Sequence, residues 1–526
     1  VEKVRIDPGN YADKKRFEEI DYTDESYKEE LIRIEEKFTP LVLLCKKNGV
    51  AMRIGTNHGS LSDRILSRFG DTPEGMVASA MEFLNVCKKH NFTDVVLSMK
   101  ASNTIVMVQA YRLLVAQMIS TNCIYPLHLG VTEAGEGEDG RIKSSVGIGA
   151  LLEDGIGDTI RVSLTEKPEA EIPVAQKLLK KYTSDDRTLV PIQANYRLFY
   201  NPYSYSKRSS TSNGKIGGSN APVVIADLST VSTIKPSHFF GFGYSYSKEL
   251  DKWNISDSAA DFVYIGDSEL TFELPGTIQV ICNYDSWGES KCADYQPLVS
   301  QSKLKLLHVE QFGFVKHDVA ISDLSYLKER PNITIILESK YANTTQLVRL
   351  FFLRMKEMGL ENPVILSTIL ETEDPEIFQL WNSADLGSLF IDGFGDGIWL
   401  QSNQPRQHIN ATAFGILQAT RTRISKTEYI SCPSCGRTLF NLQETTAKIR
   451  EKTSHLKGLK IGIMGCIVNG PGEMADADYG YVGTGPGKIH LYKEKTVMLK
   501  NVPEDQAVEA LIKLIKENGD WVEKPE

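Results

Sequence analysis

The sequence predicts an α/β protein of three segments, at residues 1–183, 184–405 and 406–526. Short apolar runs alternate with amphipathic helical stretches through the first two segments, as in a parallel sheet built from strand–helix repeats. A stretch rich in serine, glycine and lysine, from 203 to 220, indicates an exposed loop or linker. The last segment contains a cysteine pair and a glycine-rich loop around a third cysteine, which indicates a small α/β domain around a metal site.

Five apolar runs of the first segment are expected to be strands, and each ends in a polar cluster. They lie at 4–6, 51–54, 95–97, 126–129 and 159–162. The helices between them include one that begins at Thr72 and Pro73, where threonine caps the helix and proline occupies its first turn. Polar side chains at the carboxyl ends of successive strands are typical of a (β/α)8 barrel, which requires eight strands. The charged stretch 136–145 is expected to be a flexible, helix-capping loop.

The polar clusters contain four cations that suit a phosphorylated ligand, namely Arg5, Arg53, Lys100 and Arg161. Arginine's planar guanidinium binds phosphate oxygens in pairs, whereas lysine acts as a point charge. A single basic residue after a strand is usually solvated or ion-paired. Four of them at the same end of successive strands favour an anion-binding pocket instead.

Uncharged or titratable groups accompany these cations. Asn57, His58, Thr132 and Ser163 add hydrogen-bonding groups to the expected pocket. Glu133 differs from them, because a carboxylate among cations either pairs with an arginine or carries a proton during catalysis.

The last segment concentrates three of the eight cysteines in two short motifs, at Cys432, Cys435 and Cys466. Three thiolates can converge on one metal centre, and Glu473 is the natural oxygen ligand to complete it. An iron–sulfur cluster that does chemistry benefits from one weakly held iron, whereas a structural zinc ion is normally closed by four ligands. From spacing alone, a redox dithiol or a zinc site completed by His455 or His490 stays open.

Further apolar runs in the second segment predict a second barrel-like domain. They lie at 190–193, 223–226, 262–265, 278–282, 306–309, 333–337, 364–366 and 389–391. Carboxylates follow several of these runs, but they lack the dense set of cations of the first segment. We therefore assign this domain a structural role and no catalytic residue.

Composition excludes several classes of protein. Hydrophobic residues make up 41% and charged residues 24% of the chain, as in globular proteins, and a net charge of -9 argues against a nucleic-acid binder. No apolar run is long enough to cross a membrane, and no signal peptide is recognisable. The 8 cysteines do not suggest a disulfide framework in a chain of 526 residues, and an iron–sulfur site requires a reducing compartment.

The two cysteine motifs, which read CPSCGR and GCIVNGPGE, resemble the cluster-binding domain of the (E)-4-hydroxy-3-methylbut-2-enyl diphosphate synthases, the IspG or GcpE family of the non-mevalonate isoprenoid pathway. The resemblance implies a 4Fe-4S cluster held by Cys432, Cys435, Cys466 and Glu473. It also identifies the five strands as strands four to eight of a TIM-type barrel, so that about three strand–helix units would lie upstream of Val1. The second segment resembles the inserted domain of plant-type and some bacterial members, which spaces and orients the other two.

By the same resemblance, the protein is an iron–sulfur oxidoreductase that converts 2-C-methyl-D-erythritol 2,4-cyclodiphosphate reductively into 4-hydroxy-3-methylbut-2-enyl diphosphate. The residues expected to line its substrate pocket are Arg5, Arg53, Asn57, Lys100, Thr132, Arg161, Ser163 and Asn469, with His58 in a supporting position. Glu133 is the expected proton carrier, and Glu473 is the ligand that the cluster can release. Asp7 replaces an asparagine that is usual in the family, so no phosphate contact is expected from it.

Electrons are expected from a reduced ferredoxin or flavodoxin, in a bacterial cytoplasm or a plastid stroma. The resemblance leaves open whether the active site forms within one chain or across a homodimer. Two rival functions are a zinc-stabilised binding or scaffold protein and a hydrolase or isomerase barrel, which would not need Cys466.

Overall fold

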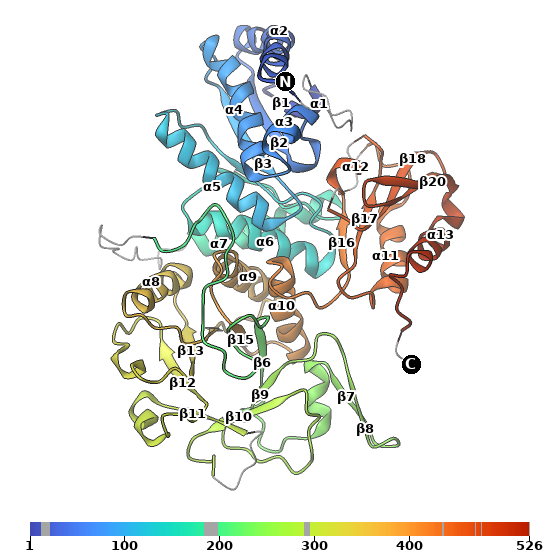
Figure 1. Ribbon diagram of the computed structural model, residues 1–526. Coiled ribbons are helices and arrows are strands. Elements are labelled where there is room, and N and C mark those ends of the chain that lie inside the picture. The colour runs from blue at the N-terminus through green and yellow to red at the C-terminus, as the bar shows by residue number, and fades with distance from the viewer. Residues whose placement is uncertain are drawn as a thin grey trace. The chain divides into compact units, whose positions relative to one another are not determined.

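The computed structural model describes residues 1–11, 22–183, 198–288, 295–433, 436–468, 470–474 and 476–524 (Figure 1). The chain divides into two compact units. The first contains 1–176, 202–204 and 426–526, and the second contains 177–201 and 205–425. The three-segment division drawn from the sequence stays a prediction. Among the described ranges, no helix is both long and apolar enough to cross a membrane.

Five parallel strands of the first unit follow one another in chain order. They are β1 (Lys3–Ile6), β2 (Ala51–Asn57), β3 (Val95–Lys100), β4 (His128–Leu129) and β5 (Thr159–Ile160). β1, β2 and β3 form one sheet, β4 pairs with β5, and a bridge from Leu97 to Leu127 lies between β3 and β4. In this register Asn57 is opposite Lys100. The predicted strands are confirmed, and their polar ends share one edge.

Helices connect these strands and bury apolar faces against them. They are α1 (Pro8–Tyr11), α2 (Asp24–Asn48), α3 (Asp63–Phe69), α4 (Pro73–Lys89), α5 (Thr104–Ser120) and α6 (Gly137–Glu153), with a short 3-10 turn η1 (His58–Ser60). After β5 come the 3-10 turn η2 (Pro168–Ala170) and α7 (Glu171–Thr183), whose residues from Lys177 on belong to the second unit. α4 begins as predicted. The Thr72 hydroxyl accepts a hydrogen bond from the Gly75 amide at 3.2 Å, and Pro73 is the first helical residue.

The prediction of a flexible loop at 136–145 is wrong, because α6 runs through this stretch. Its charged side chains are paired rather than solvated, and Lys143 Nζ lies 2.7 Å from the Glu428 carboxylate. Gly140 permits a close approach, since a Cβ there would lie 2.6 Å from a backbone oxygen just upstream. The glycines and charges that suggested a loop therefore serve helix packing.

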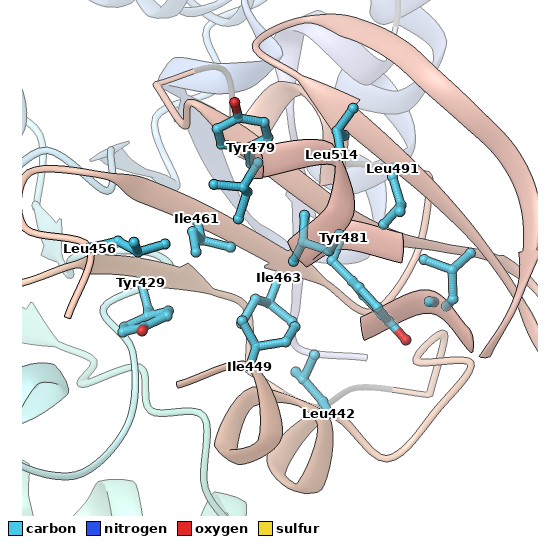
Figure 2. Close-up of a cluster of buried hydrophobic side chains, with 14 residues drawn as sticks. Tyr429, Leu442, Ile449, Leu456, Ile461, Ile463, Tyr479, Tyr481, Leu491 and Leu514 are labelled. Atoms are coloured by element: carbon cyan, nitrogen blue, oxygen red, sulfur yellow. The ribbon is translucent and has the colours of Figure 1, made fainter. Parts of the chain in front are cut away.

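The last part of the first unit is a five-stranded sheet in the order β16–β17–β18–β19–β20. Its strands are β16 (Glu428–Ser431), β17 (Lys460–Met464), β18 (Tyr479–Gly485), β19 (Lys488–Lys493) and β20 (Thr496–Pro503), and its helices are α11 (Leu442–Thr453), α12 (Gly470–Glu473) and α13 (Glu504–Glu517). The first three strands are parallel, and the last two are antiparallel to their neighbours. Figure 2 shows the apolar cluster between this sheet and its helices. The predicted strand before Cys466, the hairpin and the closing helix are confirmed.

The second unit is built on a closed barrel of parallel strands in the order β10–β11–β12–β13–β14–β15–β6–β9 (Figure 1). The strands are β6 (Val223–Asp227), β9 (Phe262–Tyr264), β10 (Gln279–Asn283), β11 (Tyr295–Val299), β12 (Gly313–Asp318), β13 (Ile333–Ser339), β14 (Val364–Ile369) and β15 (Gly397–Gln401). Every one of them contributes to one interior apolar cluster, which includes Phe262, Phe314 and Trp399. The second barrel-like domain is confirmed.

Two strands predicted for this barrel are wrong. The other elements of the unit are η3 (Pro236–Phe242), β7 (Tyr244–Ser247), β8 (Lys252–Ile255), η4 (Gln301–Leu306), η5 (Ser325–Leu327), α8 (Thr344–Glu357), α9 (Pro375–Ile391) and α10 (Arg406–Ala419). The run at 306–309 begins at the end of η4, and the run at 389–391 is the end of α9. The predicted strand at 190–193 lies outside the described residues.

The serine-rich stretch 203–220 is irregular, as predicted, but Asn213 and Ile216 in its later part are buried. Ile216 is fully buried in the interior cluster of the barrel. Asn213 Nδ2 donates to Thr334 Oγ1, at the start of β13, at 3.4 Å. This part of the loop therefore closes the end of the barrel at which the strands begin.

Candidate active site

A pocket of about 210 Å³ lies at the carboxyl ends of the strands of the first unit. It is lined by Arg5, Arg53, Asn57, Lys100, Thr132, Glu133, Arg161, Ser163, Cys432, Pro433, Arg437, Met464, Cys466, Gly470 and Glu473. The strand ends and the two cysteine motifs are far apart in the sequence, but they line the same pocket. Two further predicted site residues, Cys435 and Asn469, lie outside the described residues.

Arg5 is held in place by acceptors on β2. Its guanidinium donates to the Gly55 carbonyl oxygen at 3.1 Å and to Asn57 Oδ1 at 3.2 Å. Asp7 lies 3.5 Å from the same guanidinium and accepts a hydrogen bond from Ser60 Oγ at 2.9 Å. Burial raises the pKa of Asp7 to about 6, although Arg5 and Ser60 oppose this shift. Asp7 does not belong to the pocket lining, so it orients Arg5 rather than facing a ligand.

Arg5, Arg53, Lys100 and Arg161 form the cationic wall of the pocket, in which Arg53 is half-buried and Lys100 is buried. Lys100 is only 5% exposed. Burial, and then the charges of Arg53, Arg161 and Arg5, lower the pKa of Lys100 to about 7. Burial also lowers the pKa of Arg53, whose Nε has no hydrogen-bond partner among the residues that the structure describes. Because these like charges repel one another, an anionic ligand would relieve their repulsion.

Arg161 lines the pocket and is also paired with a carboxylate. Its Nε and Nη2 donate to the Glu171 carboxylate at 3.2 and 3.3 Å. Glu171 is the first residue of α7, and its Oε1 also accepts a hydrogen bond from the Leu164 amide at 3.2 Å. Glu171 thereby orients the guanidinium of Arg161, and a ligand phosphate would use its remaining N–H donors.

Glu133 occupies an unusual backbone position beside the pocket. Its φ of 50° is rare for a residue other than glycine and marks local strain. The residue is 4% exposed. Burial, and then the negative charge of Glu473, raise the pKa of Glu133 well above its ordinary value, and the two carboxyls are hydrogen-bonded to each other. In this arrangement the two carboxyls share a proton.

Cys432 and Cys466 face the same pocket as Glu473. The Gly465 amide donates a hydrogen bond to Cys432 Sγ at 3.3 Å, as backbone amides do towards sulfurs that ligate iron. Two soft sulfur donors and one carboxylate suit an iron–sulfur cluster that has one weakly held iron.

The histidines considered for a zinc site lie elsewhere. His455 Nε2 contacts the Val522 carbonyl oxygen at 2.8 Å. Neither His455 nor His490 lines the pocket that contains the cysteines. Within the described ranges, no three Cys, His, Asp or Glu side chains are grouped closely enough to hold one metal ion. His455 and His490 therefore do not complete a zinc site with these cysteines.

His58 lies in an adjoining hollow rather than in the main pocket. Its Nε2 is 2.9 Å from Asp71 Oδ1. Burial disfavours the charged imidazolium, but the hydrogen bonds and the charge of Asp71 outweigh it and raise the pKa of His58. This position suits the supporting role predicted for His58.

Two glycines bring the backbone of the 3-10 turn η1, which follows β2, into contact with that of α12 in the second cysteine motif. A Cβ on Gly59 would lie 2.0 Å from the Gly472 carbonyl oxygen, and a Cβ on Gly472 would lie 2.0 Å from the Gly59 carbonyl oxygen. Any larger residue at either position would push the two backbones apart. Since Glu473 directly follows Gly472, this contact sets the place of its carboxylate beside Glu133. Sequence reasoning missed the contact, because a glycine-rich loop carries no sign of its spatial neighbour.

Comparison with known proteins places both parts of this site in one family. Residues 1–176 match the GcpE TIM-barrel domain, and residues 428–517 match the GcpE protein C-terminal domain. The 4-hydroxy-3-methylbut-2-en-1-yl diphosphate synthase (flavodoxin) of Parabacteroides distasonis is 51% identical over 527 residues, which cover 99% of this chain and 83% of that protein. Proteins of the same name from Bacteroides fragilis (50% identity, 100% and 81% coverage) and Leptospira interrogans (45% identity, 99% and 82% coverage) are also similar.

Proposed function

Because the chain belongs to the GcpE family of 4-hydroxy-3-methylbut-2-en-1-yl diphosphate synthases, we propose that its pocket binds 2-C-methyl-D-erythritol 2,4-cyclodiphosphate for reductive ring opening. The chain is an oxidoreductase of isoprenoid precursor synthesis, and 4-hydroxy-3-methylbut-2-enyl diphosphate is its product. One observation carries the assignment of the site: the strand-end cations and the cysteine motifs line the same pocket. The cations suit a diphosphate, and the cysteines suit a redox group.

The diphosphate would bind to the cationic wall. Arg5 and Arg161 are already oriented by Asn57 and Glu171, so little side-chain freedom is lost when they grip phosphate oxygens. Lys100 supplies a buried point charge in the same pocket. Thr132 and Ser163, which also line the pocket, offer hydroxyl groups to the remaining oxygens.

Replacing Lys100 by methionine tests this role. Lys100→Met is expected to weaken binding of the cyclic diphosphate by roughly 10- to 100-fold, because one buried charge-assisted contact is lost. In the wild type, affinity should fall as the pH rises through about 7, where the ligand-free amine loses its proton. The variant should lack this step. Isothermal titration calorimetry on cluster-free protein at several pH values measures both effects.

The exposed Lys47 on α2 provides the matched control. Lys47→Met should change neither the affinity nor its dependence on pH. Equal pH dependence in the wild type and in Lys100→Met would show that another group governs binding.

A 4Fe-4S cluster fits the residues beside this wall. Cys432, Cys466 and Glu473 would hold it together with Cys435, the fourth ligand predicted from the sequence. The hydrogen bond from the Gly465 amide to Cys432 Sγ supports this assignment. When bound, the cluster would supply the reducing electrons and a Lewis-acidic iron.

We propose Glu133 as the proton carrier, because loss of a hydroxyl group as water requires a proton. Glu133 is buried beside the pocket, within hydrogen-bonding reach of Thr132 and Glu473 and in the field of Lys100. Its burial keeps bulk water away from the proton that it delivers.

Flavodoxin is the proposed electron donor, since the similar proteins carry that word in their names. Ile467 and Val468, which directly follow Cys466, are 44% and 58% exposed and offer an apolar contact for a carrier. Ferredoxin is the alternative donor, and an active site shared across a homodimer is the alternative to one formed within a single chain.

The similar proteins are bacterial, so we place the enzyme in a bacterial cytoplasm. In this proposal segment 1–183 binds substrate, segment 184–405 is inserted, and segment 406–526 carries the cluster.

Metal analysis and ligand binding test the proposal separately. Protein purified without oxygen should be brown and contain about four irons per chain, whereas colourless protein with a single zinc ion would contradict the cluster. Calorimetry with the cyclic diphosphate and cluster-free protein tests the pocket alone. If Arg53→Met binds as tightly as the wild type, the cationic wall is not the substrate site.

A further inference from the structure

The mouth of the second barrel carries polar side chains that the proposed reaction does not use. The interior apolar cluster takes residues from every strand of the barrel, among them Ile225, Phe262, Ile281, Leu298, Phe314, Ile336, Ile365 and Trp399. Residues two apart on a strand share a face. On every strand except β11, which ends too early, the next residue on this face is polar. We call these residues the mouth ring: Asp227, Tyr264, Asn283, Lys316, Glu338, Ser367 and Gln401.

Contacts across the barrel show that the side chains of Lys316, Glu338 and Gln401 in the mouth ring point inward. Gln401 Nε2 on β15 donates to Glu338 Oε1 on β13 at 3.2 Å, past the intervening strand β14. Lys316 Nζ on β12 lies 2.8 Å from the same Glu338 oxygen. It also lies 5.1 Å from the centre of the Trp399 ring on β15 and 5.8 Å from that of Tyr264 on β9. Since β9 and β15 are each three strands away from β12, Lys316 extends across the interior.

The mouth ring is open to solvent above and closed by a buried floor below. The Lys316 and Glu338 side chains are 36% and 22% exposed. Trp399 beneath them is fully buried, and its Nε1 has no hydrogen-bond partner within the part of the chain that the structure describes. An unpartnered buried donor is unfavourable, so the floor retains capacity for an acceptor oxygen.

The chemistry of the mouth ring indicates its class of ligand. Asp227 and Glu338 supply acceptors, and Lys316 supplies a donor. Asn283 and Gln401 already donate to Asp267, Glu338 and Ser367, so a ligand would exchange hydrogen bonds with this network. With two carboxylates against one ammonium, the ring does not favour phosphate, in contrast to the cationic pocket of the first unit. A metal ion is not favoured either, because no described group of three Cys, His, Asp or Glu side chains is close enough to hold one. Alternating donors and acceptors beside an aromatic ring suit hydroxyl groups on a short carbon chain.

We propose that the mouth ring binds a small, uncharged polyhydroxylated molecule, that is, a polyol or a monosaccharide. Ligand sites of (β/α)8 barrels lie at the carboxyl ends of the strands, and the mouth ring occupies that end of a closed barrel. The domain then contributes a ligand-binding site of its own and is more than a spacer. The proposal does not depend on the reaction assigned to the first unit.

Saturation-transfer difference NMR on the full chain tests the proposal with four probes: meso-erythritol, D-ribose, D-glucose and D-mannose. At least one probe should receive saturation from the wild-type protein. Glu338→Gln and Gln401→Ala should each weaken its apparent affinity on the order of tenfold, since each removes hydrogen bonds to the ligand. Lys356→Met, at an exposed position on the outer helix α8, is the matched control and should leave the affinity unchanged.

A competition experiment separates this site from the cationic pocket. Inorganic pyrophosphate is expected to occupy the pocket of the first unit and to leave the probe signal intact. The proposal is overturned if none of the four probes receives saturation, if neither variant weakens binding, or if pyrophosphate displaces the probe. Thermal unfolding of each variant controls for its fold. If Glu338→Gln proves unstable, Gln401→Ala decides alone, because Gln401 lies at the partly exposed end of β15.

Discussion

Gly472→Ala is expected to reduce turnover on the order of 100-fold, while the variant still folds and retains its iron. The added methyl group would lie 2.0 Å from the Gly59 carbonyl oxygen, so α12 and the turn η1 must move apart. Glu473 would move with α12, away from Glu133. A displacement of about 1 Å at a reacting centre is enough for such a loss. Measuring kcat and iron content on the same sample separates this effect from loss of the cluster.

Gly59→Ala tests the same contact from the other side and should cause a similar loss. The double variant should be little worse than either single variant, because both substitutions open one contact. Gly485→Ala is the matched control, since a Cβ at that position meets nothing within 4 Å. Fully additive losses, or normal turnover in Gly472→Ala, would show that the two backbones do not need to touch during catalysis.

The gathering of the strand-end residues could be predicted because parallel strands bring all their carboxyl ends to one edge. Lys100 ends β3 and Arg161 directly follows β5, so the order of these parallel strands predicts that the two residues lie at one edge, whereas Arg53 lies within β2. Their partners could not be predicted in the same way. Glu171, which orients Arg161, depends on where α7 begins, and no spacing rule specifies that position.

One error in the fold has a clear physical cause: an apolar run indicates burial and does not by itself distinguish a strand from a helix. The run at 389–391 is apolar because the whole last part of α9 is buried, not because it is a strand. β15, which lies just beyond it, was missed although it carries Trp399 into the barrel interior. The glycines of α6 led to the wrong prediction of a loop, because glycine-rich stretches are common in loops. In α6 they permit close packing.

The largest loss of turnover is expected for Glu133→Gln, in the range of roughly 10²- to 10⁴-fold that follows removal of a general acid. Glutamine keeps the size and hydrogen-bonding capacity of the side chain, but it has no proton to deliver. Because the cationic wall is untouched, the Kd of cluster-free protein for the cyclic diphosphate should stay within about threefold of the wild-type value. Glu169→Gln, at an exposed position in η2, is the control. A parallel loss of affinity would assign Glu133 to binding rather than to proton transfer.

The same variant should also change how stability depends on pH. In the cluster-free protein, burial and then Glu473 raise the folded-state pKa of Glu133 above its ordinary value of 4.5. Above that pH the folded state keeps a proton that the unfolded chain releases, so wild-type stability falls as the pH rises towards the raised pKa. Glutamine removes this loss, and the Tm of Glu133→Gln relative to the wild type should therefore increase with pH. A constant difference in Tm would mean that the two carboxyls do not share a proton, and proton transfer by Glu133 would lose its physical basis.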